Sequence, residues 1–448
     1  MMNQGVHIIT LGCKVNQSES EAIAARCRNQ NGWENHGSNG DGGLCIINTC
    51  AVTQKAEMQS RQAVRKAVRS HPDAAIVVTG CYAQLDPDAF AAIEGVDYVI
   101  GQGHKHQLPE IVHPKAHFRS AAGTESCAPG PEIRHTDISG YRRFAPIHAP
   151  AVTARTRPFL KIQDGCDTFC SYCIVPYTRG RSRSLPPDQA VSAFRDLLET
   201  GAPEIVLSGI HIGKYGTDLS PQTNLCGLLK TLDAIEGGHR IRLSSIEPTE
   251  ITDELLGVIR DSARICPHFH VPLQSGDPRV LKKMKRPYEP ELFSERVEKI
   301  RSLFPDAAVG ADVLIGFPGE DDAAFEQTRS LIDRLPVTYL HVFPYSPRPG
   351  TLAARFSGSV PQARIKERCR TVHALGLEKK RRFYQGMIGK TLDVVIEETR
   401  GQNNNLSKGL SENYIPVYAE NASGLQGSRT GCRITDVHTE QSLKGAAI

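Results

Sequence analysis

The 448-residue sequence predicts an α/β fold in three parts: an N-terminal parallel α/β domain, a central partial barrel of six β/α units, and a small C-terminal antiparallel β-barrel. Three observations indicate this. Short β-rich apolar runs alternate with helical segments up to residue 118, and the same alternation recurs between residues 157 and 350. After residue 385, helix signals stop and alternating β patterns with Gly, Ser and Asn turns replace them.

The N-terminal domain is predicted over residues 1–118. Its strand candidates are VHIIT (6–10), LCIIN (44–48) and AIVVT (75–79). Strand–helix–strand alternation implies parallel strands with right-handed crossovers. Residues 119–153 are rich in Pro, Ser, His and Gly without periodicity, which predicts a linker.

The central domain is predicted over residues 154–382 and the C-terminal domain over 383–448. Six central strands are expected, at FLKIQ (159–163), EIVLSGI (204–210), RIRLSSI (240–246), HFHVPLQ (268–274), VGADVLIGF (309–317) and YLHVFPY (339–345). Six β/α units predict a curved parallel sheet that lacks two of the eight units of a complete barrel. TLDVVIEE (391–398) and NYIPVY (413–418) predict a β-barrel of about the OB-fold's size.

Composition restricts the function classes. No stretch reaches the roughly 18 apolar residues of a membrane helix, and the first residues have no signal pattern, so we expect a cytoplasmic chain without a membrane partner. The net charge of +4 is too mild to indicate a nucleic-acid partner by itself. Thirteen cysteines in a cytosolic chain indicate metal binding, catalysis or core packing in preference to disulfides.

The central domain opens with the motif GCDTFCSYC, which holds Cys166, Cys170 and Cys173 directly after its first strand. Loops at the carboxyl ends of parallel strands form active sites in this architecture. Three thiolates can hold three irons of a [4Fe–4S] cube and leave the fourth iron open for a ligand such as S-adenosylmethionine. Structural zinc, which takes four ligands, and core packing are the alternatives, and the missing fourth cysteine disfavours zinc.

Cys13, Cys50 and Cys81 are far apart in sequence, but each stands just after one of the three N-terminal strands. Parallel strands bring their carboxyl ends to one edge of the sheet, so the three thiols are expected to converge there. This predicts a second site with three thiol ligands. The alternative is that these cysteines are buried in strands, as cysteines often are.

The cysteine motif and three further stretches resemble the radical S-adenosylmethionine enzymes. The stretches are LSGIHIGKYG (207–216), SSIEP (244–248) and VLIGFPGE (313–320). The resemblance implies that S-adenosylmethionine contacts Tyr172, Ser208, Gly209, Ser244, Glu247 and Gly316. By position alone, Ser244 and Glu247 are as well explained as helix caps.

Two three-cysteine sets and a C-terminal β-barrel resemble the methylthiotransferases. LGCKVNQSES (11–20), NTCAVT (48–53), GCYAQ (80–84) and KIQDGCDTFCSYCIVPYTRGRSRS (161–184) are most similar to those acting on threonylcarbamoyladenosine in tRNA. Relatives acting on isopentenyladenosine usually read GCQMN after the first strand, and those acting on a ribosomal-protein aspartate read GCPKN, where this chain has GCKVN. The segment GSNGDGGLC (37–45) departs from the family pattern.

This resemblance implies transfer of a methylthio group to carbon 2 of the adenine ring of N6-threonylcarbamoyladenosine beside the anticodon. It implies two [4Fe–4S] clusters, the N-terminal one carrying the sulfur, and S-adenosylmethionine as both methyl donor and radical source. It also implies an electron donor such as flavodoxin or ferredoxin and a source of sulfur. No side-chain acid or base is predicted as a catalytic residue.

RNA binding is predicted from the basic segment RGRSRS (179–184), whose Arg179, Arg181 and Arg183 are the expected contacts to the anticodon loop of tRNA. KKMKR (282–286), EKKRR (378–382) and the basic helix after Cys50 add to it, although each alone is more often a solvated surface. GLSENYIPV (409–417) resembles the tRNA-binding TRAM domain.

The alternatives to this function are the same chemistry on isopentenyladenosine tRNA or a ribosomal-protein aspartate, or a non-enzymatic RNA-binding protein with structural zinc.

Overall fold

The structure is a computed structural model of the 448-residue chain and describes all of it except residues 1–4, 31–42, 113–129, 148–154 and 400–405. The chain forms two compact units. We call residues 1–153, 163–185 and 346–354 the N-terminal unit, and residues 154–162, 186–345 and 355–448 the barrel unit. The segment with Cys166, Cys170 and Cys173 therefore belongs to the N-terminal unit.

The N-terminal unit is built on a five-stranded parallel sheet in the order β1–β2–β3–β4–β5. The strands are β1 (Val6–Thr10), β2 (Leu44–Thr49), β3 (Ala75–Gly80), β4 (Tyr98–Ile100) and β5 (Glu132–Arg134). The first three match the predicted strands. β5 lies inside the predicted linker, where a three-residue, partly exposed edge strand leaves no apolar run to detect. Residues 119–129 and 148–153 of that linker lie outside the described residues.

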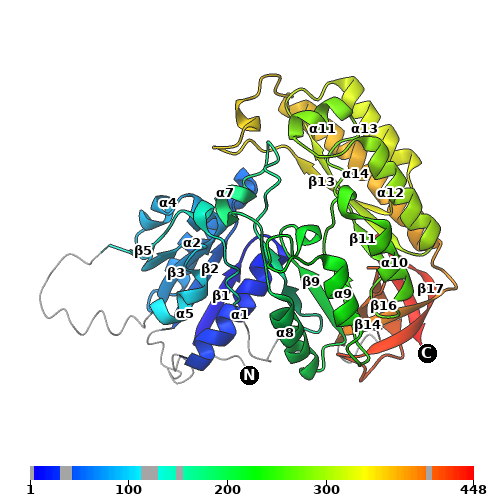
Figure 1. The fold of residues 1–448 in the computed structure, drawn as a ribbon, viewed down its shortest axis with the longest axis horizontal. Helices are drawn as coiled ribbons and strands as arrows, with labels where there is room; N and C mark the ends of the chain where they lie inside the picture. The colour runs from blue at the N-terminus through cyan, green and yellow to red at the C-terminus, as the bar shows by residue number, and fades with distance from the viewer. Residues whose placement is uncertain (1–4, 31–42, 113–129, 148–154, 400–405) are drawn as a thin grey trace, which may run out of the picture. The chain divides into compact units, whose positions relative to one another are not determined.

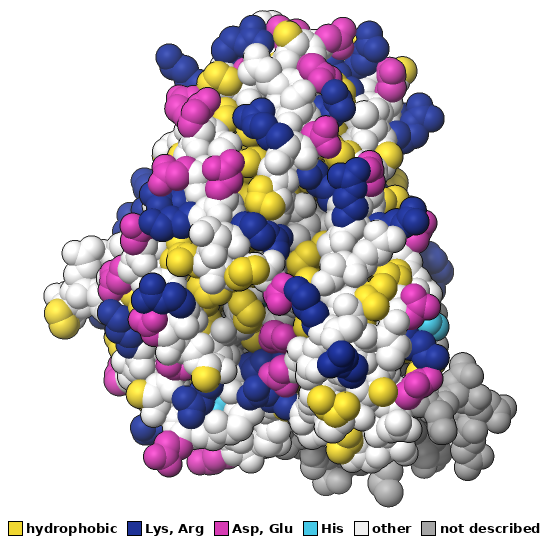
Figure 2. Space-filling model, turned by 90° about the vertical axis from the view of Figure 1, so that its right-hand side faces the viewer, with side chains coloured by type: hydrophobic (Ala, Val, Ile, Leu, Met, Phe, Trp, Pro, Cys, Tyr) yellow, Lys and Arg dark blue, Asp and Glu magenta, His cyan; other side chains and the backbone are white. Residues whose placement is uncertain are grey.

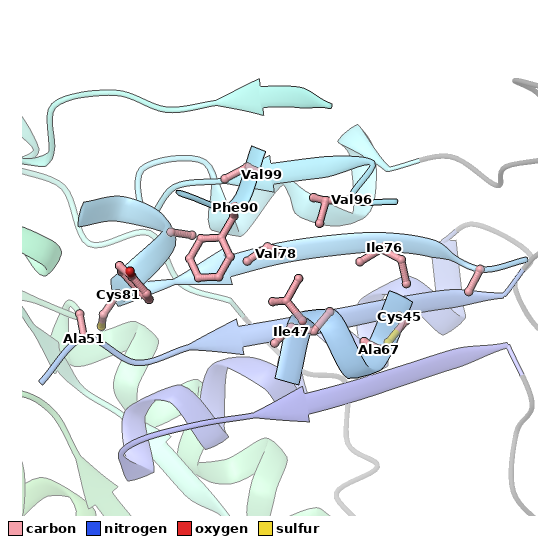
Figure 3. Packing of buried hydrophobic residues seen from close by; sticks show 14 residues of the cluster. Cys45, Ile47, Ala51, Ala67, Ile76, Val78, Cys81, Phe90, Val96 and Val99 are labelled. Carbon is pink, nitrogen blue, oxygen red and sulfur yellow. The ribbon is translucent and has the colours of Figure 1, made fainter. Parts of the chain in front are cut away.

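Helices cover both faces of this sheet (Figure 1). On one face, α1 (Lys14–Gln30) and α5 (Leu108–Ile111) pack against Ile46 and Val77 through Ile23 and Leu108. On the other, α2 (Gln54–Ser70) and α4 (Asp88–Ala91) pack against the alternate strand residues. Figure 3 shows this second cluster, in which Phe90 lies by Val78 and Val99, and Ala67 lies beside Cys45. Burial on both faces explains the nearly continuous apolar runs of the strands.

The barrel unit contains the six predicted parallel strands. They are β6 (Phe159–Lys161), β9 (Glu204–Ser208), β10 (Arg240–Leu243), β11 (His268–His270), β12 (Ala308–Ile315) and β13 (Tyr339–Pro344). They pair as two three-stranded sheets, β10–β9–β6 and β11–β12–β13, and the Ile246 amide joins the two by donating to the His270 carbonyl at 2.9 Å. The helices between the strands are α8 (Pro187–Glu199), α9 (Leu225–Asp233), α10 (Asp253–Asp261), α11 (Pro278–Met284), α12 (Pro290–Leu303) and α13 (Asp322–Arg334).

The long helix α14 (Gln362–Gln385) leads into a closed five-stranded barrel in the order β14–β15–β16–β18–β17. Its strands are β14 (Thr391–Thr399), β15 (Leu406–Ser411), β16 (Pro416–Glu420), β17 (Arg429–Thr439) and β18 (Ser442–Ala447). The barrel was predicted as antiparallel, but β16 and β18 run parallel. Tyr414, predicted within a strand, has a φ of 65° and lies in the turn before β16.

A buried charge cluster ties the partial barrel to this small barrel within the barrel unit. The fully buried Glu204 accepts hydrogen bonds from Arg240 at 2.6 Å and Arg242 at 2.7 Å. Both guanidinium groups also donate to carbonyl oxygens of the small barrel, at Leu410, Ser411 and Glu412. Burial favours the neutral acid, but Arg242 and Arg240 hold the pKa of Glu204 well below its usual range. We call Glu204, Arg240 and Arg242 the Glu204 cluster.

Within the part of the chain that the structure describes, no helix combines the length and apolar character that crossing a membrane requires.

Candidate cluster-binding sites

Cys166, Cys170 and Cys173 are presented by one tight loop of the N-terminal unit. The loop begins at β7 (Gln163–Asp164), runs into α7 (Val175–Arg179), and returns to pair with β7 through β8 (Arg183–Ser184). The Cys166 amide donates to the Gly180 carbonyl at 3.1 Å, and the Cys173 amide donates to the Cys170 carbonyl at 3.0 Å. All three side chains are half-buried, so one side of the loop can hold a ligand that is reached from solvent.

The backbone around Cys166 requires a glycine and supplies a donor to sulfur. Gly165 has a φ of +71°, and a Cβ there would lie 1.9 Å from the Arg181 carbonyl oxygen. The Thr168 amide donates to Cys166 Sγ at 3.5 Å. Amide donors to sulfur stabilise a metal-bound thiolate and influence the reduction potential of an iron–sulfur cluster, so this loop fits such a group.

Cys13, Cys50 and Cys81 are brought to the same edge of the N-terminal sheet. Cys13 follows β1, Cys50 follows β2, and Cys81 opens α3 (Cys81–Leu85) after β3. Figure 3 shows Cys81 and Ala51 at this end of neighbouring strands. A Cβ added to Gly12 would lie 2.8 Å from Cys50 Sγ, so the loop holding Cys13 lies directly against Cys50. Burial, followed by the nearby Cys81 and Cys13 thiols, raises the pKa of Cys50 to about 11.

In neither cysteine set do all three sulfur atoms lie close enough together to bind one metal ion. Among the described residues, three ligating side chains lie within 4.8 Å of one another at His7, Cys45 and His71 and at His270, Asp312 and His341, but in neither cysteine set. Thiolates on one tetrahedral zinc lie about 3.8 Å apart because Zn–S bonds are about 2.3 Å long. Three ligands to separate irons of a cluster need not lie that close together.

A buried network of charges and amides joins the cysteine loop to α1. Arg179, which is 1% exposed, donates to Glu19 at 3.0 Å and to Asp164 at 2.9 Å. The same guanidinium donates to the Asn16 side chain at 2.6 Å. Lys105 donates to Glu19 at 2.5 Å. These contacts fix the position of the cysteine loop within the N-terminal unit, because each charged group is satisfied by a partner from another segment.

This placement changes the interpretation of the basic segment after the cysteines. Arg179 and Arg183 are buried, and both pair with Asp164, so in this structure neither is available to RNA. Arg181 is 48% exposed and pairs with Asp167, and a contact between it and tRNA stays a prediction. The sequence alone could not separate the three, because the fold-back of β8 onto β7 decides which arginines turn inward.

The residues predicted to contact S-adenosylmethionine in the barrel unit follow the strands as expected. Ser208 ends β9, Gly209 follows it, and Ser244 and Glu247 follow β10. The Ser244 hydroxyl oxygen is buried and has no hydrogen-bond partner among the described residues, which fits a site for a polar ligand. Glu247 is already paired with Arg286, so its role as a ligand contact stays a prediction.

The last two predicted contacts are Gly316 and Tyr172. Gly316 follows β12 with a φ of +84°, and its amide donates to Glu320 at 3.1 Å. A Cβ at Gly316 would lie 2.4 Å from Ile365, so the turn requires glycine for packing whether or not a ligand is bound. Tyr172, in the cysteine loop of the N-terminal unit, is half-buried.

Basic side chains do not gather into one patch on the face that Figure 2 displays, where Lys and Arg are interspersed with Asp and Glu. In α2, by contrast, Ser60, Val64 and Ala67 are buried, which leaves a basic face on the other side. The exposed members of that face are Lys55, Arg65, Lys66 and Arg69. Because α2 begins four residues after Cys50, this helix is the structural candidate for RNA contacts near the N-terminal cysteines.

Comparison with known proteins defines the class of protein. Residues 160–332 match the Radical SAM superfamily, and residues 5–101 match the uncharacterized protein family UPF0004. A solved structure of the radical S-adenosylmethionine methyltransferase TsrM from Kitasatospora setae covers 77% of this chain and 77% of its own, with a TM-score of 0.55. At 14% sequence identity this likeness shows the fold alone. The chain is thus a radical S-adenosylmethionine enzyme, a class that uses S-adenosylmethionine and a [4Fe–4S] cluster.

Curated relatives define the family. The threonylcarbamoyladenosine tRNA methylthiotransferase MtaB of Bacillus subtilis is 38% identical over 421 residues, which cover 93% of this chain and 91% of that protein. The tRNA-2-methylthio-N(6)-dimethylallyladenosine synthase of Moorella thermoacetica is 32% identical, with 98% of each chain covered. The chain belongs to the tRNA methylthiotransferase family.

Proposed function

We propose that this enzyme adds a methylthio group to carbon 2 of N6-threonylcarbamoyladenosine beside the anticodon of tRNA. The observation that carries the proposal is the presence of two separate three-cysteine sets, Cys13, Cys50 and Cys81 at a sheet edge and Cys166, Cys170 and Cys173 on one loop. The relative with 38% identity is named for this substrate, which supports the choice of acceptor.

Each set of cysteines would hold one [4Fe–4S] cluster. When bound, the cluster of the loop and S-adenosylmethionine supply the chemistry that breaks an unactivated aromatic C–H bond, and the cluster of the sheet edge supplies the sulfur. Residues 1–118 form the proposed domain of the second cluster, 154–382 the radical domain, and 383–448 the RNA-binding domain. A reductant such as flavodoxin or ferredoxin and a source of sulfur complete the set of proposed partners.

The chain's own residues position and polarise these groups. Gln102 donates from its side-chain amide to Cys81 Sγ at 3.5 Å, which would stabilise the thiolate when metal is bound. The Ser60 hydroxyl accepts from the Cys50 amide and donates to the Cys50 carbonyl, both at 3.1 Å, which fixes the backbone at that ligand. Ser208, Ser244 and Gly209 would orient S-adenosylmethionine from the ends of β9 and β10.

The test is metal analysis followed by product analysis on anaerobically reconstituted protein. We expect about eight irons per chain, and about four in a variant with Cys13, Cys50 and Cys81 all changed to Ala. Wild-type enzyme should convert threonylcarbamoyladenosine tRNA to its methylthio form, detected by mass spectrometry of the nucleosides. Zinc without sulfide, or eight irons without any methylthio product, would contradict the proposal.

A second candidate acceptor is dimethylallyladenosine (isopentenyladenosine) tRNA, because a relative named for that product aligns with 98% of this chain. Offering both tRNAs to the same enzyme preparation separates the two substrates. Methylthio transfer to the dimethylallyl substrate alone would reverse the assignment.

A further inference from the structure

Three adjacent strands of the barrel unit bring two histidines and an aspartate together. His270 lies on β11, Asp312 on β12 and His341 on β13, and Asp312 is directly opposite His341 in the strand register. His270 Nε2 lies 2.8 Å from Asp312 Oδ1, and His341 Nδ1 lies 3.3 Å from the same oxygen. The two imidazole rings are 4.9 Å apart between centroids. We call this the His–Asp–His cluster.

The donor set of the His–Asp–His cluster suits a cation. The Asp312 side chain is 21% exposed and that of His270 is 9% exposed, so an anion is held largely away from water. Buried carboxylates are paired with a cation or coordinate a metal. The ion-pair partners recorded for Asp312 among the described residues are these two imidazoles, which are neutral unless protonated.

The distances match those between neighbouring ligands of one metal ion. First-row divalent metals bind histidine nitrogen and carboxylate oxygen at about 2.0–2.2 Å, so adjacent ligand atoms lie about 3.0 Å apart in an octahedron and about 3.4 Å apart in a tetrahedron. The two separations in the cluster, 2.8 and 3.3 Å, are close to these values. We propose that His270, Asp312 and His341 form a binding site for one divalent first-row metal ion, with two nitrogen ligands and one oxygen ligand.

The groups behind the cluster are those that a metal-binding histidine requires. Metal ligands of this type bind through one ring nitrogen while the other is held by a hydrogen-bond partner. His270 Nδ1 lies 3.2 Å from the Tyr339 hydroxyl, and that hydroxyl lies 2.8 Å from His268 Nε2. This chain of contacts fixes the ring of His270 with Nε2 toward Asp312.

One member of the cluster, His341, borders a cavity. A cavity of about 420 Å³ is lined by Tyr339 and His341, and the His341 side chain is 51% exposed. A metal held by three protein ligands keeps open positions for an exogenous group. The cavity lining also includes Arg157, His373 and Lys380, so an anionic oxygen ligand such as a carboxylate is the class of group that suits the open positions.

Manganese(II) is the probe that separates this site from the cysteines, because it prefers oxygen and imidazole ligands to thiolates. Protein reconstituted with its iron–sulfur clusters is titrated with Mn²⁺ alone, in the absence of tRNA. Free Mn²⁺ is measured by electron paramagnetic resonance. We expect one saturable site per chain, with nitrogen hyperfine coupling from imidazole in the bound signal.

Asp312→Asn should weaken this site at least tenfold, and so should His341→Ala. His373→Ala is the matched control, because His373 lines the cavity without belonging to the cluster, and it should bind Mn²⁺ as wild type does. His341 is half exposed, so its replacement decides the question even if Asp312→Asn fails to fold. Absence of saturable binding in wild type, or equal binding in wild type and both cluster variants, would overturn the proposal.

Discussion

The cysteines of the two three-cysteine sets differ in burial, and we expect substitutions in the two sets to have different effects. Cys50 and Cys81 are buried at the sheet edge, whereas the loop cysteines are half-buried. Cys50 needs a bound metal to hold thiolate charge, because burial raises its pKa to about 11. Cys27 and Cys45 pack in the two cores of the N-terminal sheet and are not expected to bind a cluster.

Changing one cysteine of each set should separate two activities. Cys166→Ala should abolish reductive cleavage of S-adenosylmethionine, measured as release of 5′-deoxyadenosine. Cys50→Ala should retain cleavage but stop methylthio transfer, because the sulfur-carrying site is lost while the radical site is intact. Cys27→Ala, a buried helix position outside both sets, is the control and should retain both activities. Full thiolation by Cys50→Ala would refute the assigned role of the sheet-edge site.

Two neighbouring arginines provide a matched test of buried against exposed ion pairs. Arg179→Met leaves Glu19 buried without one of its cations and Asp164 with Arg183 alone, so we expect a loss of about 3–5 kcal/mol in the stability of the N-terminal unit. Arg181→Met removes a half-exposed pair with Asp167 and should cost about 0–1 kcal/mol. Thermal unfolding midpoints of the two variants measure the difference. Equal midpoints would show that the buried network does not hold the loop.

At the scale of elements, the attachment of the small β-barrel depends on charges buried between β9, β10 and β15. The Glu204 cluster supplies carboxylate–guanidinium pairs and donors to four carbonyls of the small barrel. Removing one member leaves a buried charge without its partner. The resulting loss of folding free energy is larger than the net stabilisation that the ion pair provides.

Glu204→Gln should therefore loosen the attachment of the small barrel. The variant leaves Arg242 buried without its carboxylate and Arg240 with Asp393 alone, and we expect a destabilisation of about 3–5 kcal/mol. Limited proteolysis near residues 385–391 should release the C-terminal barrel faster than in wild type. Glu254→Gln is the control, because its pair with Lys230 is exposed on both sides. An unchanged cleavage rate in Glu204→Gln would contradict this role.

Glu412, in the turn after β15, should make stability depend on pH. Burial raises its pKa from 4.5 to about 7, and its Oε2 atom has no hydrogen-bond partner among the described residues. The folded state therefore keeps a proton that the unfolded state loses, so stability falls as pH rises from about 4.5 to 7, by up to about 3 kcal/mol. Glu412→Gln should remove this contribution. We expect its unfolding midpoint to fall less than that of wild type between pH 5 and pH 7, and parallel curves would contradict the expectation.

The sequence predicted those elements that have periodic or apolar patterns. The six barrel strands and the first three N-terminal strands were found because each is a short apolar run. β5 was missed because three partly exposed residues carry no such signal. The convergence of Cys13, Cys50 and Cys81 could be predicted because each follows a parallel strand. The carboxyl ends of parallel strands lie at one edge of the sheet, whatever conformation the loops adopt.

Tertiary folding decided what sequence reasoning could not. Arg179 and Arg183 turned out to be buried because β8 returns to β7, and only the folded loop shows that Asp164 lies between them. The His–Asp–His cluster was also missed. His270, Asp312 and His341 are separated by 42 and 29 positions in a sequence without ligand spacing, and strand pairing alone brings them together.

At the scale of the whole molecule, the same N-terminal unit contains both cysteine sets, and the barrel unit contains the predicted S-adenosylmethionine contacts of β9, β10 and β12. The proposed reaction needs all of them in one chain, together with a tRNA whose adenosine already carries the threonylcarbamoyl group. The modification state of the acceptor nucleoside in tRNA therefore reports most directly on the activity of the complete enzyme.

The most direct measurement is the nucleoside profile of total tRNA from a strain in which the gene for this chain is deleted. We predict that 2-methylthio-N6-threonylcarbamoyladenosine disappears, that unmodified N6-threonylcarbamoyladenosine accumulates in its place, and that a plasmid copy restores the first but a Cys50→Ala copy does not. Persistence of the methylthio nucleoside in the deletion strain would contradict the proposed function, as would loss of the methylthio-dimethylallyl nucleoside instead.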